Sequence, residues 1–155
     1  MLKPESGLWD SMRLSDGVRL GHVNLEVTDF RRARRFYDRF LPVLGFLRVP
    51  PDDPYWLGYR KGRTTLWITV SHPRRVVRGT PHVPTDGVKD PISDHIAFAA
   101  PSSKRVRQIE VALRLRGFRP VYPTAKQKTQ GGWYTSNAWN DPDNNVLEIY
   151  AVTRR

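Results

Sequence analysis

The chain contains two segments of the same design, and this duplication is the strongest constraint on its fold. The first runs HVNLEVTDFRRARRFYDRFLPVLGF from His22, and the second runs HIAFAAPSSKRVRQIEVALRLRGF from His95. Each begins with a histidine, continues through an alternating stretch and a helical stretch, and ends in a Gly-Phe pair. Two long units, rather than several short ones, predict a duplicated module inside one domain and not a solenoid.

The first module is expected to form a strand, a helix and further short strands. Residues 21–28 alternate between apolar and polar side chains, which indicates a half-buried strand. Its polar face would carry three side chains that can bind a metal or a ligand, namely His22, Asn24 and Glu26. Asp29 is the expected N-cap of a helix that Pro42 ends, with Gly45 as its terminator. Short strands are expected over residues 46–49, 55–60 and 64–71.

The second module repeats this order of elements. Ile96 and Phe98 are expected to face a helix that begins after Ser102 or Ser103, while His95 points the other way. Further strands are expected over residues 133–139 and 146–150. In the last of these, Glu148 alternates with apolar neighbours, so its carboxylate should lie on the face that does not pack on the helix.

The length of 155 residues suits one domain preceded by an arm. Residues 1–19 form the expected N-terminal arm, and residues 20–155 form the single domain. Within it, module one covers about 20–71, a connecting loop rich in proline and glycine covers about 72–93, and module two covers about 94–152. The loop carries His72 and His82, which are either part of a binding loop or surface residues of a connector.

Composition limits both the compartment and the chemistry. The chain has no cysteine, which excludes disulfides and thiolate metal sites and leaves His, Asp and Glu as metal ligands. It has neither a run of about 18 apolar residues nor a signal-type N-terminus, so a soluble, cytoplasmic protein with no membrane partner is expected.

The strong positive charge leaves three interpretations open. Lys and Arg number 26 against 15 Asp and Glu, which gives a net charge of +11. This excess could steer a small anionic substrate into a cleft, bind nucleic acid, or simply be solvated. Nucleic acid is the least favoured partner because no recognised binding motif accompanies the charge. Part of the excess lies on the expected outer face of the first helix, at Arg31, Arg32, Arg34, Arg35 and Arg39.

Two equivalent histidines and one late carboxylate predict a metal site. His22 and His95 occupy the same position in the two modules, and Glu148 lies in the last strand. Two imidazoles and one carboxylate make a three-ligand site for a divalent metal that keeps open positions for a substrate. The other interpretation is a protein that keeps the same fold but uses its cleft without a metal.

The pieces GHVNLEV, FYDRFLPVLGF, DHIAFAA and WNDPDNNVLEIY resemble the vicinal oxygen chelate superfamily. This superfamily includes glyoxalases, fosfomycin-resistance transferases, bleomycin-binding proteins and extradiol dioxygenases. The resemblance covers about residues 20–152 and implies an α+β fold. In it, two βαβββ modules pair into a curved mixed sheet that encloses a metal-binding cleft. It also implies metal ligands at His22, His95 and Glu148, and the modules would pair within one chain or across a homodimer.

One departure from the family pattern matters for the chemistry. Alignment of Leu66-Trp67-Ile68 with Leu147-Glu148-Ile149 places Trp67 where a glyoxalase-like site has a fourth ligand. Tryptophan cannot coordinate a metal. The resemblance therefore implies a two-histidine, one-glutamate centre, and such a ligand set accepts Fe, Mn, Zn, Ni or Co.

The expected function is that of a metal-dependent enzyme that chelates a small, anionic, oxygen-rich substrate. Its class would be a glyoxalase- or dioxygenase-like lyase, a dioxygenase or a transferase. Glu148 and Tyr134 are the catalytic candidates, and four residues are the substrate-binding candidates: Asn24, Glu26, Trp67 and Trp133. The alternative is a protein that binds and sequesters a small molecule, such as a drug or antibiotic, without turnover.

Overall fold

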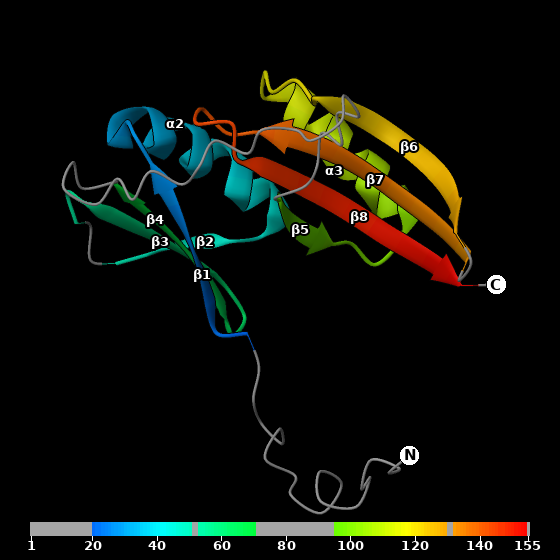
Figure 1. Ribbon diagram of the computed structural model, residues 1–155, viewed down its shortest axis with the longest axis horizontal. Coiled ribbons are helices and arrows are strands. Elements are labelled where there is room, and N and C mark those ends of the chain that lie inside the picture. Colours follow the sequence, from blue (N-terminus) through cyan, green and yellow to red (C-terminus); the bar gives the residue numbers. More distant parts are fainter. Residues whose placement is uncertain (1–19, 51–52, 71–94, 130–131, 155) are drawn as a thin grey trace, which may run out of the picture.

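The computed structural model describes residues 20–50, 53–70, 95–129 and 132–154, which form an α+β fold of two modules (Figure 1). Each module has the order strand, helix and three more strands, as the duplication predicts. Module one consists of β1 (His22–Val27), α2 (Phe30–Phe40), the 3-10 helix η1 (Leu41–Leu44), β2 (Leu47–Val49), β3 (Trp56–Lys61) and β4 (Thr64–Val70). Module two consists of β5 (His95–Ala99), α3 (Ser103–Leu115), β6 (Tyr122–Thr129), β7 (Gly132–Asn140) and β8 (Val146–Arg154).

The mixed sheet expected from the sequence is present as two four-stranded sheets, one in each module. Sheet A has the order β1-β4-β3-β2, and sheet B has the order β5-β8-β7-β6. In both sheets the first strand pairs in parallel with the last, and the other pairs are antiparallel. The two modules therefore share one topology. None of the described helices has the length and apolar character needed to span a bilayer.

Local sequence signals explain where the first helix begins and ends. The Asp29 side chain accepts a hydrogen bond from the Arg32 backbone N–H at 2.9 Å, as the N-cap prediction requires. At Pro42 the α-helix gives way to η1, since proline cannot donate in the helical ladder. Gly45 then terminates η1 with φ of 82°, a left-handed conformation that glycine adopts without strain. The predicted cap and terminator are thus confirmed.

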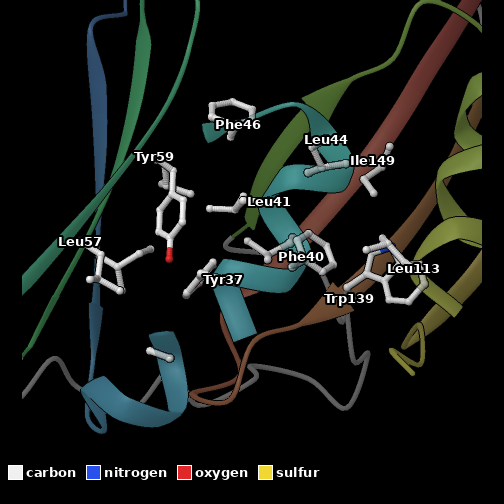
Figure 2. Packing of buried hydrophobic residues seen from close by; sticks show 14 of the residues in the cluster. Tyr37, Phe40, Leu41, Leu44, Phe46, Leu57, Tyr59, Leu113, Trp139 and Ile149 are labelled. Atoms are coloured by element: carbon white, nitrogen blue, oxygen red, sulfur yellow. The ribbon is translucent and has the colours of Figure 1, made fainter. Parts of the chain in front are cut away.

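The hydrophobic core lies on the helix-facing sides of both sheets and is continuous between the modules. Figure 2 shows α2 and η1 between the strands of sheet A and those of sheet B. Tyr37 and Leu41 pack toward Tyr59 of sheet A, while Phe40 packs toward Trp139 of sheet B, with ring centroids 6.0 Å apart. The opposite faces of both sheets therefore look away from this shared core.

A turn of module two also holds module one in place. The Asp141 carboxylate is buried and accepts a 2.7 Å hydrogen bond from the Tyr37 hydroxyl of α2. Asp143 accepts hydrogen bonds from the backbone N–H and the hydroxyl of Thr28, just after β1. Because β8 begins three residues after Asp143, these contacts fix the end of β1 relative to β8.

The pattern of residues did not predict β6, which is the edge strand of sheet B. Its sequence YPTAKQKT lacks apolar alternation, and most of its side chains are exposed. Buried polar contacts fasten it to α3 instead: Glu110 accepts hydrogen bonds from the backbone N–H and hydroxyl of Thr124. Asn137 of β7 donates to the Thr124 hydroxyl at 2.9 Å. An edge strand held this way needs few apolar side chains.

Some expectations lie outside the described residues. These are the N-terminal arm over residues 1–19 and the connecting loop over about 72–93, with His72 and His82. The five arginines expected on the outer face of α2 are all exposed, as predicted: Arg31, Arg32, Arg34, Arg35 and Arg39.

Candidate metal centre

The outer face of sheet B brings together three of the predicted site residues. β5 and β8 are parallel neighbours, and Ala97 lies opposite Glu148. His95 is two residues before Ala97 on the same face of β5, so its side chain can contact Glu148. The distance from His95 Nε2 to Glu148 Oε2 is 3.2 Å. On its other side, Glu148 Oε1 accepts a 2.9 Å hydrogen bond from the Tyr134 hydroxyl of β7. A single carboxylate thus contacts an imidazole and a phenol.

Burial differs across this cluster. Glu148 is only 5% exposed, whereas the His95 side chain is 30% exposed. Burial, followed by the hydrogen bond to the Glu148 carboxylate, raises the pKa of Tyr134 well above its usual value. The phenol therefore stays protonated at neutral pH and donates its hydrogen bond. The imidazole side of the cluster remains the one that an approaching ligand reaches.

His22 lies elsewhere, on the outer face of sheet A. It is exposed, and it pairs with Thr65 of β4. Over residues 20–50, 53–70, 95–129 and 132–154, no three His, Cys, Asp or Glu side chains come together as a metal site. The structure thus brings His95, Glu148 and Tyr134 together and leaves His22 on the other sheet.

The candidate substrate-binding residues divide between the two sheets. Asn24 and Glu26 share the outer face of β1 with His22, and the Asn24 amide donates a 3.2 Å hydrogen bond to the Thr69 hydroxyl. Trp67 lies on the same face of sheet A, in register with Asn24. Trp133 is on the opposite face of β7 from Tyr134, where Lys126 stacks on it at 4.4 Å. The structure therefore does not bring Trp133 to the face of Glu148.

The sequence places Tyr150 on the face of Glu148, but Tyr150 was not among the predicted site residues. It stacks on Tyr134 with centroids 5.3 Å apart and an interplanar angle of 16°. It lies two residues after Glu148 in β8, so strand alternation alone places it on the same face. The signal was therefore present in the sequence.

A groove opens where the free edges of the two sheets lie. It has a volume of about 800 Å³ and is lined mostly by apolar side chains from β1, η1, β4 and β5, among them Val23, Val43 and Phe98. Both β1 and β5 are edge strands, so each presents one side of its backbone without a strand partner among the described residues. Its lining combines residues that face the helices, such as Phe98, with Ala97, which lies opposite Glu148.

Comparison with solved structures finds the same architecture in several proteins. A candidate glyoxalase from Bacillus halodurans is 25% identical, with a TM-score of 0.62 over 89% of this chain and 98% of that one. A glyoxalase/bleomycin resistance protein/dioxygenase family enzyme from Burkholderia phytofirmans PsJN is 19% identical, with a TM-score of 0.61 over 88% and 100%. Lactoylglutathione lyase from Agrobacterium tumefaciens is 18% identical, with a TM-score of 0.59 over 87% and 93%. No protein-family model matches the sequence, and no curated protein matches it.

These structural neighbours cover 87–89% of the chain. The chain has the vicinal oxygen chelate fold. The strand registers make its internal symmetry explicit. In module two, Ala97 of the first strand pairs with Glu148, and in module one, Asn24 of the first strand pairs with Trp67. Since Asn24 and Ala97 each lie two residues after the module's histidine, Trp67 is the counterpart of Glu148.

The donor set on sheet B fits the kind of ion that the vicinal oxygen chelate fold implies. An imidazole nitrogen and a carboxylate oxygen 3.2 Å apart are of the types that Fe, Mn, Zn, Ni and Co accept. The Tyr134 hydroxyl donates a hydrogen bond to Glu148 and so fixes the orientation of the carboxylate, as residues that surround a metal ligand commonly do. Two ligands alone would hold a divalent ion weakly, so a third protein ligand is needed.

Proposed function

We propose that this chain is a metal-dependent enzyme that acts on a small, anionic, oxygen-rich substrate. The observation that carries the proposal is the contact of His95 with Glu148, backed by the Tyr134 hydroxyl. The reaction class would be a glyoxalase- or dioxygenase-like lyase, a dioxygenase or a transferase. The structural neighbours support this range, because they include a lactoylglutathione lyase and a dioxygenase family enzyme.

His95 and Glu148 would hold a divalent ion of Fe, Mn, Zn, Ni or Co, with His22 as the third ligand. When bound, such an ion acts as a Lewis acid that polarises adjacent oxygens of a substrate. Tyr134 keeps its proton and holds one Glu148 oxygen in place, so the carboxylate has a fixed orientation. The exposed side of His95 leaves room for a substrate to approach.

We propose that a second copy of the chain supplies His22. Within one chain, the outer faces of the two sheets look away from the shared core, so His22 and Glu148 do not meet. The apolar groove beside β1 and β5, in which Val23 and Phe98 are only half-buried, supports pairing of the sheet edges between two copies. A homodimer would thus close two equivalent sites.

Charge supports an anionic substrate. The net charge of +11 creates a positive field around the molecule that attracts small anions and raises their association rate. This effect weakens as salt is added, because the Debye length falls to about 8 Å at physiological ionic strength.

The proposal is tested by the metal content of the untreated protein. Elemental analysis should find about one divalent metal per chain, because three protein ligands bind such an ion tightly. His95→Ala and Glu148→Gln should each lose most of it, while the matched control Glu110→Gln, on α3 at the opposite side of sheet B, should keep it. Metal content unchanged in both site variants would show that these residues are not the ligands.

The alternative function is sequestration of a small molecule without turnover. Aromatic side chains on the outer faces of both sheets favour it, namely the stacked pair Tyr134 and Tyr150 and the contacting pair Trp56 and Trp67. Such a protein would bind its ligand with the same affinity before and after removal of metal by a chelator. The enzyme proposal requires the affinity to fall.

A further inference from the structure

Trp67 lies flat against the backbone of the neighbouring strand, and only a glycine permits this. Trp67 pairs with Gly58 of β3. A Cβ atom added at Gly58 would lie 2.3 Å from Cζ3 of Trp67 and 2.9 Å from two further ring atoms. Separations under about 3 Å are well inside van der Waals contact, so any larger residue would push the indole off the sheet. Since Gly58 does not have a positive φ, the ring, and not the backbone conformation, requires this glycine.

Trp56 completes an aromatic corner around this glycine. Its ring meets Trp67 edge to face, with centroids 5.0 Å apart and an interplanar angle of 79°. Both tryptophans are half-buried, on the face of sheet A that does not pack on α2. We call Trp56, Gly58 and Trp67 the indole corner. Each ring keeps part of its surface exposed in the part of the chain that the structure describes.

The indole corner lies beside the proposed third metal ligand. Trp67 is in register with Asn24, which is two residues from His22 on the same face of β1. Two residues along a strand correspond to about 7 Å, roughly the width of one aromatic ring with its substituents. Trp67 also holds the position that Glu148 holds in module two. Module one thus has an aromatic surface where module two has a carboxylate.

We propose that the indole corner binds a planar ring of the substrate, and that Gly58 determines this specificity by letting Trp67 lie flat. An indole face attracts a flat aromatic ring in an offset-stacked arrangement. A ring stacked there would place its substituent oxygens toward His22, with the Asn24 amide nearby as a hydrogen-bonding group. This inference rests on the proposed function for the role of His22, and it names the substrate class as planar and oxygen-substituted.

The test compares catechol with cis-cyclohexane-1,2-diol, which carries two adjacent oxygens but no flat ring. Calorimetry is carried out on the protein loaded with Zn²⁺ and on the chelator-treated protein. We expect catechol to bind about tenfold more tightly than the diol, in line with about 1.4 kcal/mol of stacking. Trp67→Leu and Gly58→Ala should each remove most of this preference, whereas Trp67→Phe should keep part of it. Equal affinity for both probes in the parent protein, or no measurable binding of catechol, would overturn the proposal.

A double variant separates positioning from a general loss of structure. If Gly58 acts only through the indole, Gly58→Ala should have no further effect on catechol affinity in a Trp67→Leu background. An equal loss in both backgrounds would overturn the role of Gly58. Circular dichroism verifies that each variant folds. If Gly58→Ala does not fold, the catechol affinities of Trp67→Leu and Trp67→Phe still test whether the ring stacks on Trp67.

Metal analysis of the same proteins keeps the two proposals apart. Trp67→Leu should retain its metal and lose the preference for catechol. In the chelator-treated protein the preference for the flat ring should persist at lower affinity. Metal in the untreated protein with no dependence of catechol binding on Trp67 would refute the indole corner alone. An untreated protein that contains no metal and still binds catechol through Trp67 would refute the metal centre alone.

Discussion

Glu148 receives a hydrogen bond from Tyr134 on one oxygen and contacts His95 with the other. Burying a carboxylate is costly unless such partners satisfy it, and here the carboxylate is 5% exposed. Apolar packing does not explain why a glutamate stands at this position of an otherwise apolar strand. At the scale of the single residue, a buried and supported carboxylate beside a more exposed imidazole is the arrangement expected of a ligand pair.

Replacement of Tyr134 by phenylalanine tests this support. The variant keeps the ring that stacks on Tyr150 but removes the donor to Glu148, so the affinity for Zn²⁺ should fall about 10- to 100-fold. Competition with a chromophoric chelator measures this affinity. Tyr150→Phe is the matched control, because it removes a hydroxyl from the same face and should bind Zn²⁺ as the parent does. Identical affinities of both variants would mean that Tyr134 does not support a metal ligand.

At the scale of the elements, polar contacts rather than apolar ones decide how the edge of sheet B is held. Glu110 lies on the buried side of α3 and joins that helix to β6 through Thr124, while Arg114 contacts the same carboxylate at 2.7 Å. Burial by itself would raise the pKa of Glu110, but the hydrogen bonds from Thr124 and the contact with Arg114 outweigh it and lower the pKa below its usual 4.5. The ionised form is therefore favoured by folding.

This lowered pKa predicts how stability depends on pH. A carboxyl group with a depressed pKa in the folded state stabilises the protein above its unfolded value and loses that contribution as the pH falls. At pH 7, Glu110→Gln should reduce the free energy of unfolding by about 1–3 kcal/mol. Urea denaturation should show this difference shrinking as the pH falls below 4.5. Gln108→Ala, a change without a titrating group on the same helix, should keep a constant offset, and a constant offset for Glu110→Gln would contradict the assignment.

The elements that sequence reasoning predicted are those with strong local signals. The alternation of β1, the Asp29 cap and the Pro42 break each act within a few residues, and the structure confirms all three. β6 was not predicted because its position depends on Glu110 of the preceding helix, 14 residues before Thr124, and the sequence pattern gives Glu110 as a surface residue of that helix. Propensity and periodicity carry no information about such a partner.

The candidate site was predictable in part for the same reason. Strand alternation places Glu148 and Tyr134 on the face that faces away from α3, and the structure brings them together. The same alternation separates Trp133 from Tyr134, although both were named as site residues. No local pattern could predict how the two sheets are oriented relative to each other. That orientation is set by the packing of α2 and η1 between them (Figure 2).

At the scale of the whole molecule, the two halves of the proposed centre lie on opposite sides of one core. His22 belongs to sheet A, while His95 and Glu148 belong to sheet B. The Asp141 and Tyr37 contact fixes the modules relative to each other, so a rearrangement within one chain would break a buried hydrogen bond. Pairing of two copies leaves that contact intact. The molecule should therefore be a dimer that contains two shared sites.

Mixing two variants tests most directly whether two copies of the chain share one metal. His22→Ala and Glu148→Gln should each bind almost no metal alone, as measured by elemental analysis of the purified proteins. After the two are unfolded together and refolded as a mixture, half of the dimers combine both variants and contain one intact site, so about one quarter of the parent metal content should return. Full metal content in His22→Ala alone, or no recovery in the mixture, would contradict a centre built from His22 of one copy and from His95 and Glu148 of the other.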